Sequence, residues 1–349
     1  MEQKLIKKFR WSTIVWGILS LFMVLGAVVV VVVYMVPRTT PLLETFVERM
    51  PLPVVMVGYR SVISFRELAA NVSSVKQFYE SQDFSKIGMR VDFSTEDGKK
   101  RLKVREKEVL NKMLEDQSIV LLARKRGIFV SQEMAHQGVA RKLEEYGSAT
   151  QVKDNLKRLY GWDLAVFEER VVLPSLYEDK LKESFFKEVN PVTEAKQKIE
   201  LAAEALRNGG TFSDVTKKYS DGQTAESGGD LGWLTLEDLT PELRTSVASQ
   251  KVGVPGNVIE SNLGFHIVLV DEVKNEQNGP LYRLRQIFAR KETFSDWLTQ
   301  EMKTLPIWVF SPEYRYDQDT ARIEFKDATW KQYEEDLYNK ASGDPSFLF

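Results

Sequence analysis

The sequence predicts an α+β protein with three parts. These are a single N-terminal transmembrane helix, a mostly helical lobe, and a domain in which helices surround a small antiparallel sheet. Three observations predict this: residues 11–36 carry no charge, apolar residues recur at helical spacing through 97–126, and most strand-like runs come after 190. With 349 residues, the chain is long enough for two or three packed units.

The uncharged stretch 11–36 is longer than the roughly 20 apolar residues that span a bilayer. The ten residues before it are basic, through Lys4, Lys7, Lys8 and Arg10. The positive-inside rule therefore predicts a retained anchor in the plasma (inner) membrane, with residues 1–10 in the cytoplasm and the main domain outside it. A cleaved signal peptide is the alternative, but its apolar core would be shorter, and no A-x-A cleavage site follows.

The composition excludes several classes of function. Basic and acidic residues number 48 and 50, for a net charge of −2, which argues against nucleic acid as a partner. The absence of cysteine excludes disulfides, thiolate catalysis and cysteine-based zinc sites. The two histidines, His136 and His266, are far apart and form no HExxH pattern. We therefore expect no metal and no cofactor.

After a linker over 37–53, the lobe is predicted over 54–189. It opens with a strand, a turn at Gly58, a second strand, and a helix with Ser64 as N-cap and Glu67 at the capping-box position. Longer helices are predicted over 97–126, 131–146 and 148–160, each bounded by a capping serine or a glycine where the pattern stops. A further helix begins near Asp163, and we expect Pro174 to kink or interrupt it.

A compact domain is predicted over 190–291. A helix with Thr193 as its cap ends at Gly209-Gly210, and a short helix, a loop and helical turns follow up to 249. Strands are predicted over 256–261, 264–273 and 282–291. The remaining residues, 292–349, are predicted to form an α/β extension, with helices at both ends and a strand near 306–310.

Five short motifs lie in order within 194–273: "GGTFSDVTKKYSDG", "GGDLGWL", "LTPELRTSV", "VGVPGNVIES" and "GFHIVLV". Together they resemble the parvulin-type (PpiC-like) peptidyl-prolyl isomerases. The resemblance implies that His266 lies beneath the proline-binding pocket, with Ser261 as a small hydroxyl near it. It also implies that Gly228 and Gly229 turn the chain under that pocket, and that three leucines hold the proline ring: Leu231, Leu239 and Leu243.

The sequence departs from the family in two places. Active members carry Cys or Asp after "YSD", where this chain has Gly222; Asp221 is the neighbouring acid that could substitute. The family opens with a strand bearing "RHIL", and here the similar "YRLRQIF" follows the domain instead. This indicates circular permutation, in which 282–291 supplies the first strand and Gln286 replaces its histidine. The alternative is that this segment belongs to a separate C-terminal unit.

The stretch "VLNKMLEDQSIVLLARKRGIFVSQEMAHQ" resembles the helical chaperone lobe of SurA, PpiD and PrsA-like proteins. The two resemblances imply a membrane-anchored, extracytoplasmic isomerase that acts on X-Pro bonds of unfolded or newly exported polypeptides. Gly222 and Gln286 keep a weakly active or inactive holdase as an alternative. A structural subunit of an envelope or secretion complex is a third. For the site residues, the opposing interpretation is an ordinary core: a buried histidine and packed leucines.

Overall fold

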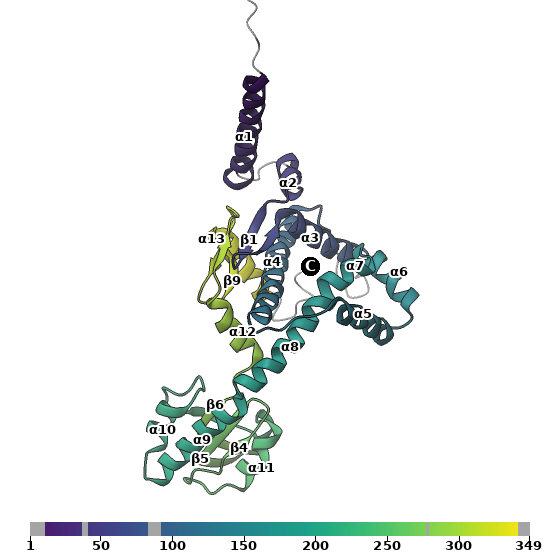
Figure 1. Cartoon of the computed structure of the whole chain (residues 1–349). Helices are drawn as coiled ribbons and strands as arrows, with labels where there is room; N and C mark the ends of the chain where they lie inside the picture. The colour runs from purple at the N-terminus through teal and green to yellow at the C-terminus, as the bar shows by residue number, and fades with distance from the viewer. Residues whose placement is uncertain (1–10, 37–40, 83–91, 277–278, 341–349) are drawn as a thin grey trace, which may run out of the picture. The chain divides into compact units, whose positions relative to one another are not determined.

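The computed structural model describes residues 11–36, 41–82, 92–276 and 279–340, and the chain divides into two compact units (Figure 1). One unit comprises Met1–Leu181 with Thr299–Phe349, and the other comprises Lys182–Leu298. The division falls at Leu181, whereas the lobe was predicted to reach residue 189. The C-terminal segment, which we predicted as an extension over 292–349, returns from residue 299 onward to the first unit.

Helix α1 (Trp11–Met35) coincides with the uncharged stretch. Its portion Val15–Met35 is long and apolar enough to cross a membrane, by length and composition. Only 6 % of its most apolar window is buried within the protein, unlike a core helix. The helix itself is thus confirmed, and its place in a bilayer is taken up below as a proposal.

A three-stranded antiparallel sheet forms one part of the first unit. Its strands are β1 (Pro53–Val57), β2 (Ser61–Ser64) and β7 (Ile307–Val309), in the order β2-β1-β7. Helix α2 (Pro41–Glu48) precedes the sheet, and α3 (Phe65–Glu80) follows β2 with the predicted Ser64–Glu67 capping box. Because β7 comes from the C-terminal segment, residues about 250 positions apart close one sheet.

Helices α4 (Glu96–Lys125), α5 (Gln132–Tyr146) and α6 (Ala149–Tyr160) confirm the predicted helices. The interruption expected near Pro174 is a wide π-helical turn. It covers Glu168–Val172, between α7 (Leu164–Phe167) and α8 (Leu173–Glu188). Proline clashes with the carbonyl four residues before it, and one widened turn relieves that clash without ending the helix.

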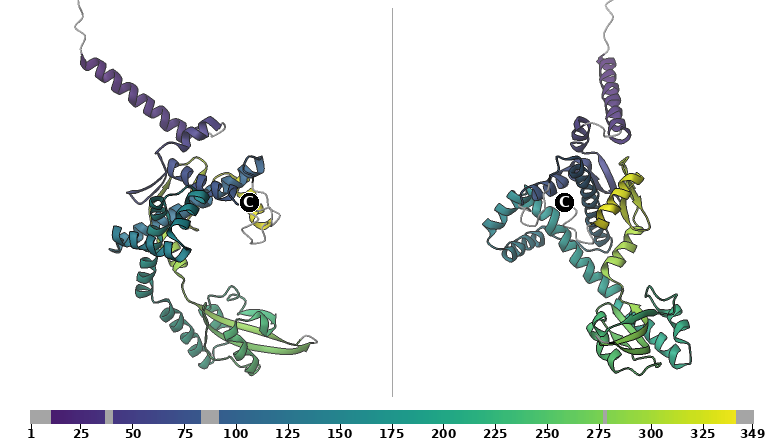
Figure 2. Two further views of the ribbon diagram at one scale, coloured as in Figure 1. Left: turned by 90° about the vertical axis from the view of Figure 1, so that its right-hand side faces the viewer. Right: turned by 180° about the vertical axis from the view of Figure 1, so that it is seen from behind.

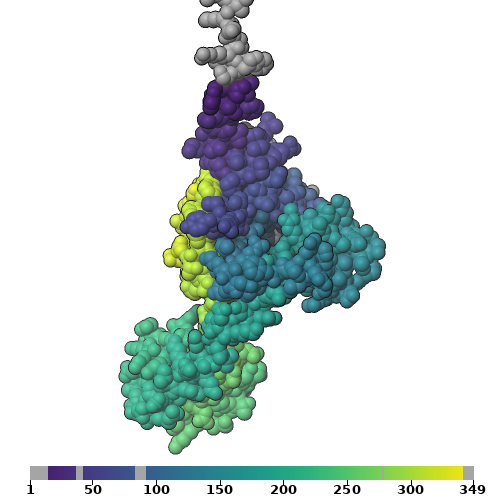
Figure 3. Space-filling view, viewed as in Figure 1, coloured from purple at the N-terminus to yellow at the C-terminus, as the bar shows by residue number. Residues whose placement is uncertain are grey.

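The C-terminal segment packs on α4. It adds strands β8 (Tyr314–Asp317) and β9 (Arg322–Phe325) and helix α13 (Ala328–Lys340). The Asn111 amide of α4 donates to the Ile323 carbonyl at 2.9 Å and accepts from the Ile323 N–H at 2.7 Å. Figure 3 shows the C-terminal segment, in yellow, side by side with the blue elements of this unit. Helix α13 was predicted from the sequence, whereas β8, β9 and this contact were not.

The second unit combines helices with a four-stranded antiparallel sheet. Helices α9 (Pro191–Arg207) and α10 (Phe212–Tyr219) come first, and α11 (Pro241–Ser249) lies between the first two strands. Helix α9 begins at Pro191, with Asn190 as its N-cap, and not at the expected Thr193. The predicted strand over 256–261 is reduced to β4 (Ile259–Glu260). Helix α12 (Phe294–Lys303) leads out of the unit.

The sheet order is β3-β6-β5-β4, with β3 at Asp230–Leu234, β5 at Gly264–Glu276 and β6 at Gly279–Arg290. Strand β6 is antiparallel to both neighbours, and Figure 2 shows β5 and β6 as the two long green strands. The segment "YRLRQIF" therefore lies in the middle of this sheet. Strand β6 is thus part of the same sheet as β5, and circular permutation of the domain stays a prediction.

Each face of this sheet has its own core. Helices α9 and α10 cover one face, through the buried side chains Ile199, Phe212, Val215, Ile267 and Ile287. Helix α11 covers part of the other face, where the buried side chains include Leu239, Leu243, Val247, Val268 and Leu284. Because side chains alternate along a strand, His266, Gln286 and Phe288 share the second face with Val268.

Candidate functional site

His266 is the centre of a buried cluster on β5, with 3 % of its surface exposed. Its Nε2 lies 2.7 Å from the Ser261 Oγ, and its ring stacks on Phe288 with centroids 4.7 Å apart. The turn between β4 and β5 fixes Ser261, whose N–H donates to the Gly264 carbonyl at 2.8 Å. The structure thus brings His266 and Ser261 together, as the resemblance implies.

The electrostatic state of His266 follows from its surroundings. Burial lowers the pKa of the imidazole, and the Gln286 side chain opposes this shift by favouring the protonated ring. The Nδ1 atom is buried and makes no hydrogen bond of ordinary geometry among the described residues. Gln286 is diagonal to His266 across β5 and β6, so it is the polar group placed to interact with that ring.

The loop 220–222 is tied to the strand beneath it. The Ser220 Oγ accepts from the N–H groups of Phe288 at 3.0 Å and Gly222 at 3.2 Å. The Asp221 carboxylate accepts from the Arg290 N–H at 3.0 Å and also pairs with the Lys198 ammonium. The Asp221 carboxylate is therefore engaged in contacts at the end of β6. Within the described part of the chain, no contact joins it to His266. Ser220, which was not among the predicted site residues, thus holds the backbone of Phe288 in place.

Gly229 allows β3 to approach β6. Its backbone has φ +82°, and a Cβ there would lie 2.4 Å from the Gln286 carbonyl oxygen. The Gln286 N–H donates to the Gly229 carbonyl at 2.9 Å. Gly228, at φ +70°, would place a Cβ 2.5 Å from the Ser213 Oγ. Both glycines are thus required by backbone conformation and close contact, and Gly229 positions the strand that carries Gln286.

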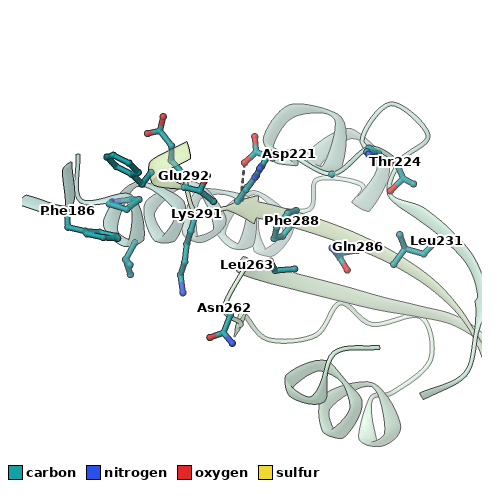
Figure 4. Close-up of a pocket in the computed structure, with 17 residues that line it drawn as sticks. Phe186, Asp221, Thr224, Leu231, Asn262, Leu263, Gln286, Phe288, Lys291 and Glu292 are labelled. Atoms are coloured by element: carbon teal, nitrogen blue, oxygen red, sulfur yellow. Dashed lines mark hydrogen bonds between the residues drawn. The ribbon is translucent and has the colours of Figure 1, made fainter. Parts of the chain in front are cut away.

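An open cleft of about 700 Å³ lies beside this cluster. Figure 4 shows Leu231, Gln286, Phe288 and Leu263 bordering the same space, with Asp221 near its edge. Of the predicted site residues, Leu231, Gln286, Asp221 and Gly222 line the cleft. Leu239 and Leu243 do not line it; they are buried in the core under α11, with 7 % and 4 % of their surfaces exposed.

Several lining residues were missed from the sequence. Phe288 follows Gln286 by two positions on one strand, so the period of 2 could have indicated it. Phe186 and Phe294 come from the end of α8 and the start of α12. No local pattern predicts that these two flanking helices contribute to the cleft, because their approach depends on how the chain enters and leaves the sheet.

Comparison with known families identifies the domain type. The family described as "PPIC-type PPIASE domain" matches residues 179–274. The match ends before β6, so the strand with Gln286 and Phe288 lies outside it.

Curated relatives are chaperones named SurA. The protein from Chromobacterium violaceum is 30 % identical over 113 residues, covering 31 % of this chain and 26 % of that protein. The one from Nitrosococcus oceani is 27 % identical over 213 residues, covering 50 % of each. That longer match exceeds the 96 residues of the family match. The chain spans between about a quarter and half of these relatives' length.

A solved structure, the peptidylprolyl isomerase PrsA from Bacillus anthracis, covers 67 % of this chain and 97 % of its own. Its sequence identity is 19 % and its TM-score 0.22. At this score the likeness does not bear on the arrangement of the present chain, so the assignment of the domain rests on the family match and on the sheet described above.

Proposed function

Because this chain carries a parvulin-type peptidyl-prolyl isomerase domain, we propose that it catalyses cis/trans isomerisation of X-Pro bonds in newly exported polypeptides. One observation carries the proposal. The hydrogen-bonded and stacked set of Ser261, His266 and Phe288 lies beside an open cleft that Leu231 and Gln286 line.

Isomerisation requires a pocket but no bond cleavage. Rotation of the X-Pro bond faces a barrier of ~18–20 kcal/mol, because conjugation holds the amide planar. A cleft lowers that barrier when it binds the twisted, less conjugated amide better than the planar one. Apolar walls remove water from the proline ring, and fixed polar groups orient the carbonyl.

The named residues divide these tasks. Leu231, Leu263 and Phe288 supply apolar contact for the proline ring. The Gln286 amide, which lines the same cleft, donates to or accepts from the backbone of the bound peptide. His266 and Ser261 stay beneath this layer and hold Phe288 and the β4–β5 turn in place. We assign them as positioning residues, since both are buried.

A weakly active or inactive holdase is the second candidate. Gly222 brings no side chain to the loop position at which active parvulins carry Cys or Asp. The neighbouring Asp221 is bound to Lys198 and the Arg290 N–H. A cleft with these contacts still binds proline-containing segments, and the helical lobe would contribute the remaining client surface.

The location follows from α1. We propose that α1 crosses the plasma (inner) membrane and holds both units on its extracytoplasmic side, in line with the basic residues 1–10. The extent of the apolar helix and its low burial support this. The competing possibility, a signal sequence that is removed, predicts a mature chain that begins after α1. N-terminal sequencing of the membrane-bound protein separates the two.

The deciding experiment is an exchange assay with the full chain in detergent micelles. Cis/trans exchange of X-Pro peptides is measured by NMR for the unaltered chain, His266→Ala and His136→Ala. Acceleration that is lost only in His266→Ala supports an isomerase. If the chain does not accelerate exchange but suppresses the aggregation of a denatured client, the isomerase proposal is wrong and the holdase is supported. A single stoichiometric partner, recovered from membranes, would instead favour a structural subunit.

A further inference from the structure

The sheet β2-β1-β7 has an unusual outer face. Antiparallel sheets in water ordinarily bury one face and present polar side chains on the other. Here Val55, Val57 and Ile63 form the buried face. On the opposite face, the register places Met56 between Val62 of β2 and Trp308 of β7, so this face is apolar as well.

Aromatic rings extend this face in both directions. Trp308 contacts Tyr59 in the β1–β2 turn, with ring centroids 5.5 Å apart. Phe310 follows Trp308 by two residues and donates its N–H to the Val54 carbonyl at 3.0 Å. The exposed fractions are 83 % for Tyr59, 42 % for Val62, 37 % for Trp308 and 39 % for Phe310. We call these four residues, with Met56, the outer patch.

The outer patch is continuous with the end of α1. Tyr34, the last residue but one of α1, lies against Phe310 with ring centroids 6.2 Å apart. Its hydroxyl donates to the Pro53 carbonyl at 2.9 Å, at the start of β1. A row of rings therefore runs from the apolar helix through Phe310 and Trp308 to Tyr59, and it starts where the helix would leave a bilayer.

We propose that the outer patch lies on the bilayer surface and inserts its rings into the headgroup region. The proposal rests on the membrane anchor proposed above. Tyr and Trp are enriched at that depth, because an apolar ring body and a polar edge suit a boundary between hydrocarbon and water. Arg60, exposed beside Tyr59, adds attraction for phosphate headgroups.

The exposed apolar side chains of helix α2 support the placement of the outer patch at the bilayer surface. Leu42 and Phe46 are four residues apart on one side of α2 and both are exposed, whereas Val47 is fully buried. The six Cα-to-Cα steps from Met35 to Pro41 span at most about 20 Å, so α2 must lie near the end of α1. A second apolar surface thus lies close to the same membrane boundary. Together, these two apolar surfaces would hold the sheet at a fixed depth relative to the bilayer.

Spin labelling tests this, because the chain has no cysteine and any introduced cysteine is unique. The full chain is reconstituted in liposomes of phosphatidylethanolamine and phosphatidylglycerol, with one nitroxide at Val62→Cys, Phe129→Cys or Val24→Cys. Phe129 is the matched control, because it is apolar and 67 % exposed in the same unit but outside the outer patch. Collision of the label with oxygen and with a water-soluble nickel complex is measured by power saturation.

We expect the label at 62 to collide several-fold more with oxygen than with nickel, and the label at 129 to show the reverse. An aqueous label at 62 together with a lipid-embedded label at 24 overturns the proposal while the anchor stands. An aqueous label at 24 removes the anchor as well. Spin–spin broadening at 62 that disappears on dilution with unlabelled chain assigns the patch to a second copy and also overturns the proposal.

Discussion

The ring of Phe288 is stacked on the imidazole of His266, with centroids 4.7 Å apart and planes inclined by 22°. The two residues are direct partners in the register of β5 and β6. Strand β6 is the last strand of its unit in chain order and lies outside the matched family region. Phe288, which covers one side of the His266 ring, therefore comes from outside that region.

Replacement of His266 is predicted to slow isomerisation. His266→Ala removes the hydrogen bond to Ser261 and the stack on Phe288, and each contributes about 1 kcal/mol. A loss of about 1.4 kcal/mol from transition-state stabilisation corresponds to a tenfold slower exchange. His136→Ala is the control, since His136 is on the exposed side of α5. Equal exchange rates for both variants, measured by NMR, would remove His266 from the site.

Gly222→Asp is predicted to raise the isomerase rate several-fold. A Cβ at this position would meet the Ser220 Oγ at 3.3 Å and the Phe288 Cβ at 3.8 Å, so a side chain needs only a small adjustment. The change restores a carboxylate where active parvulins have one. Gln223→Asp adds the same charge one residue further along the cleft wall and should have no such effect. A similar gain in both variants would point to charge alone.

Gly229→Ala is predicted to loosen the contact between β3 and β6. A left-handed conformation costs a non-glycine residue ~1–2 kcal/mol. The approach of 2.4 Å to the Gln286 oxygen adds ~1–3 kcal/mol of overpacking. Gly232→Ala is the control, because Gly232 has φ +75° with no atom near its missing Cβ. Hydrogen exchange of the β3 and β6 amides should rise much more in Gly229→Ala; equal rises would contradict the close contact.

Acidification is predicted to destabilise the sheet around β5. Burial lowers the pKa of His266 below its ordinary 6.5, so the unfolded chain binds a proton more readily than the folded one. The contribution of neutral His266 to the free energy of unfolding is therefore fully present above pH 6.5. It is lost as the pH falls from there through the lower pKa of the folded state. Hydrogen exchange of β5 amides measures this loss. His266→Gln should remove that part of the pH dependence, and an unchanged profile would assign it to other groups.

Asn111→Ala is predicted to detach the C-terminal strands from α4. The side chain makes two buried hydrogen bonds to Ile323, and their loss leaves that backbone pair unsatisfied at a cost of ~1–3 kcal/mol for each group. Asn71→Ala is the matched control, because Asn71 is half-buried and its side chain, among the described residues, bonds within its own helix, to the Glu67 carbonyl. Limited proteolysis after α12 should accelerate in Asn111→Ala alone.

Much of the local structure was predictable. Ser64 with Glu67, Ser131 and Ser148 begin helices where the sequence indicates, because a capping hydroxyl satisfies N–H groups of the first turn within a few residues. The pairing of Ser261 with His266 was implied by the resemblance, and it is also local, since both residues flank one tight turn between adjacent strands.

What the sequence alone determined is therefore local. It comprises the apolar helix α1, the capped helices, the strand alternation and, through the family resemblance, the pairing of Ser261 with His266. The tertiary structure alone decided which distant segments meet. Strand β6 lies between β3 and β5, Phe186 and Phe294 reach one cleft, and β7 closes the first sheet. The physical reason is that caps and periodicity act within a few residues, whereas strand order and cleft walls depend on burial among segments that are distant in the chain.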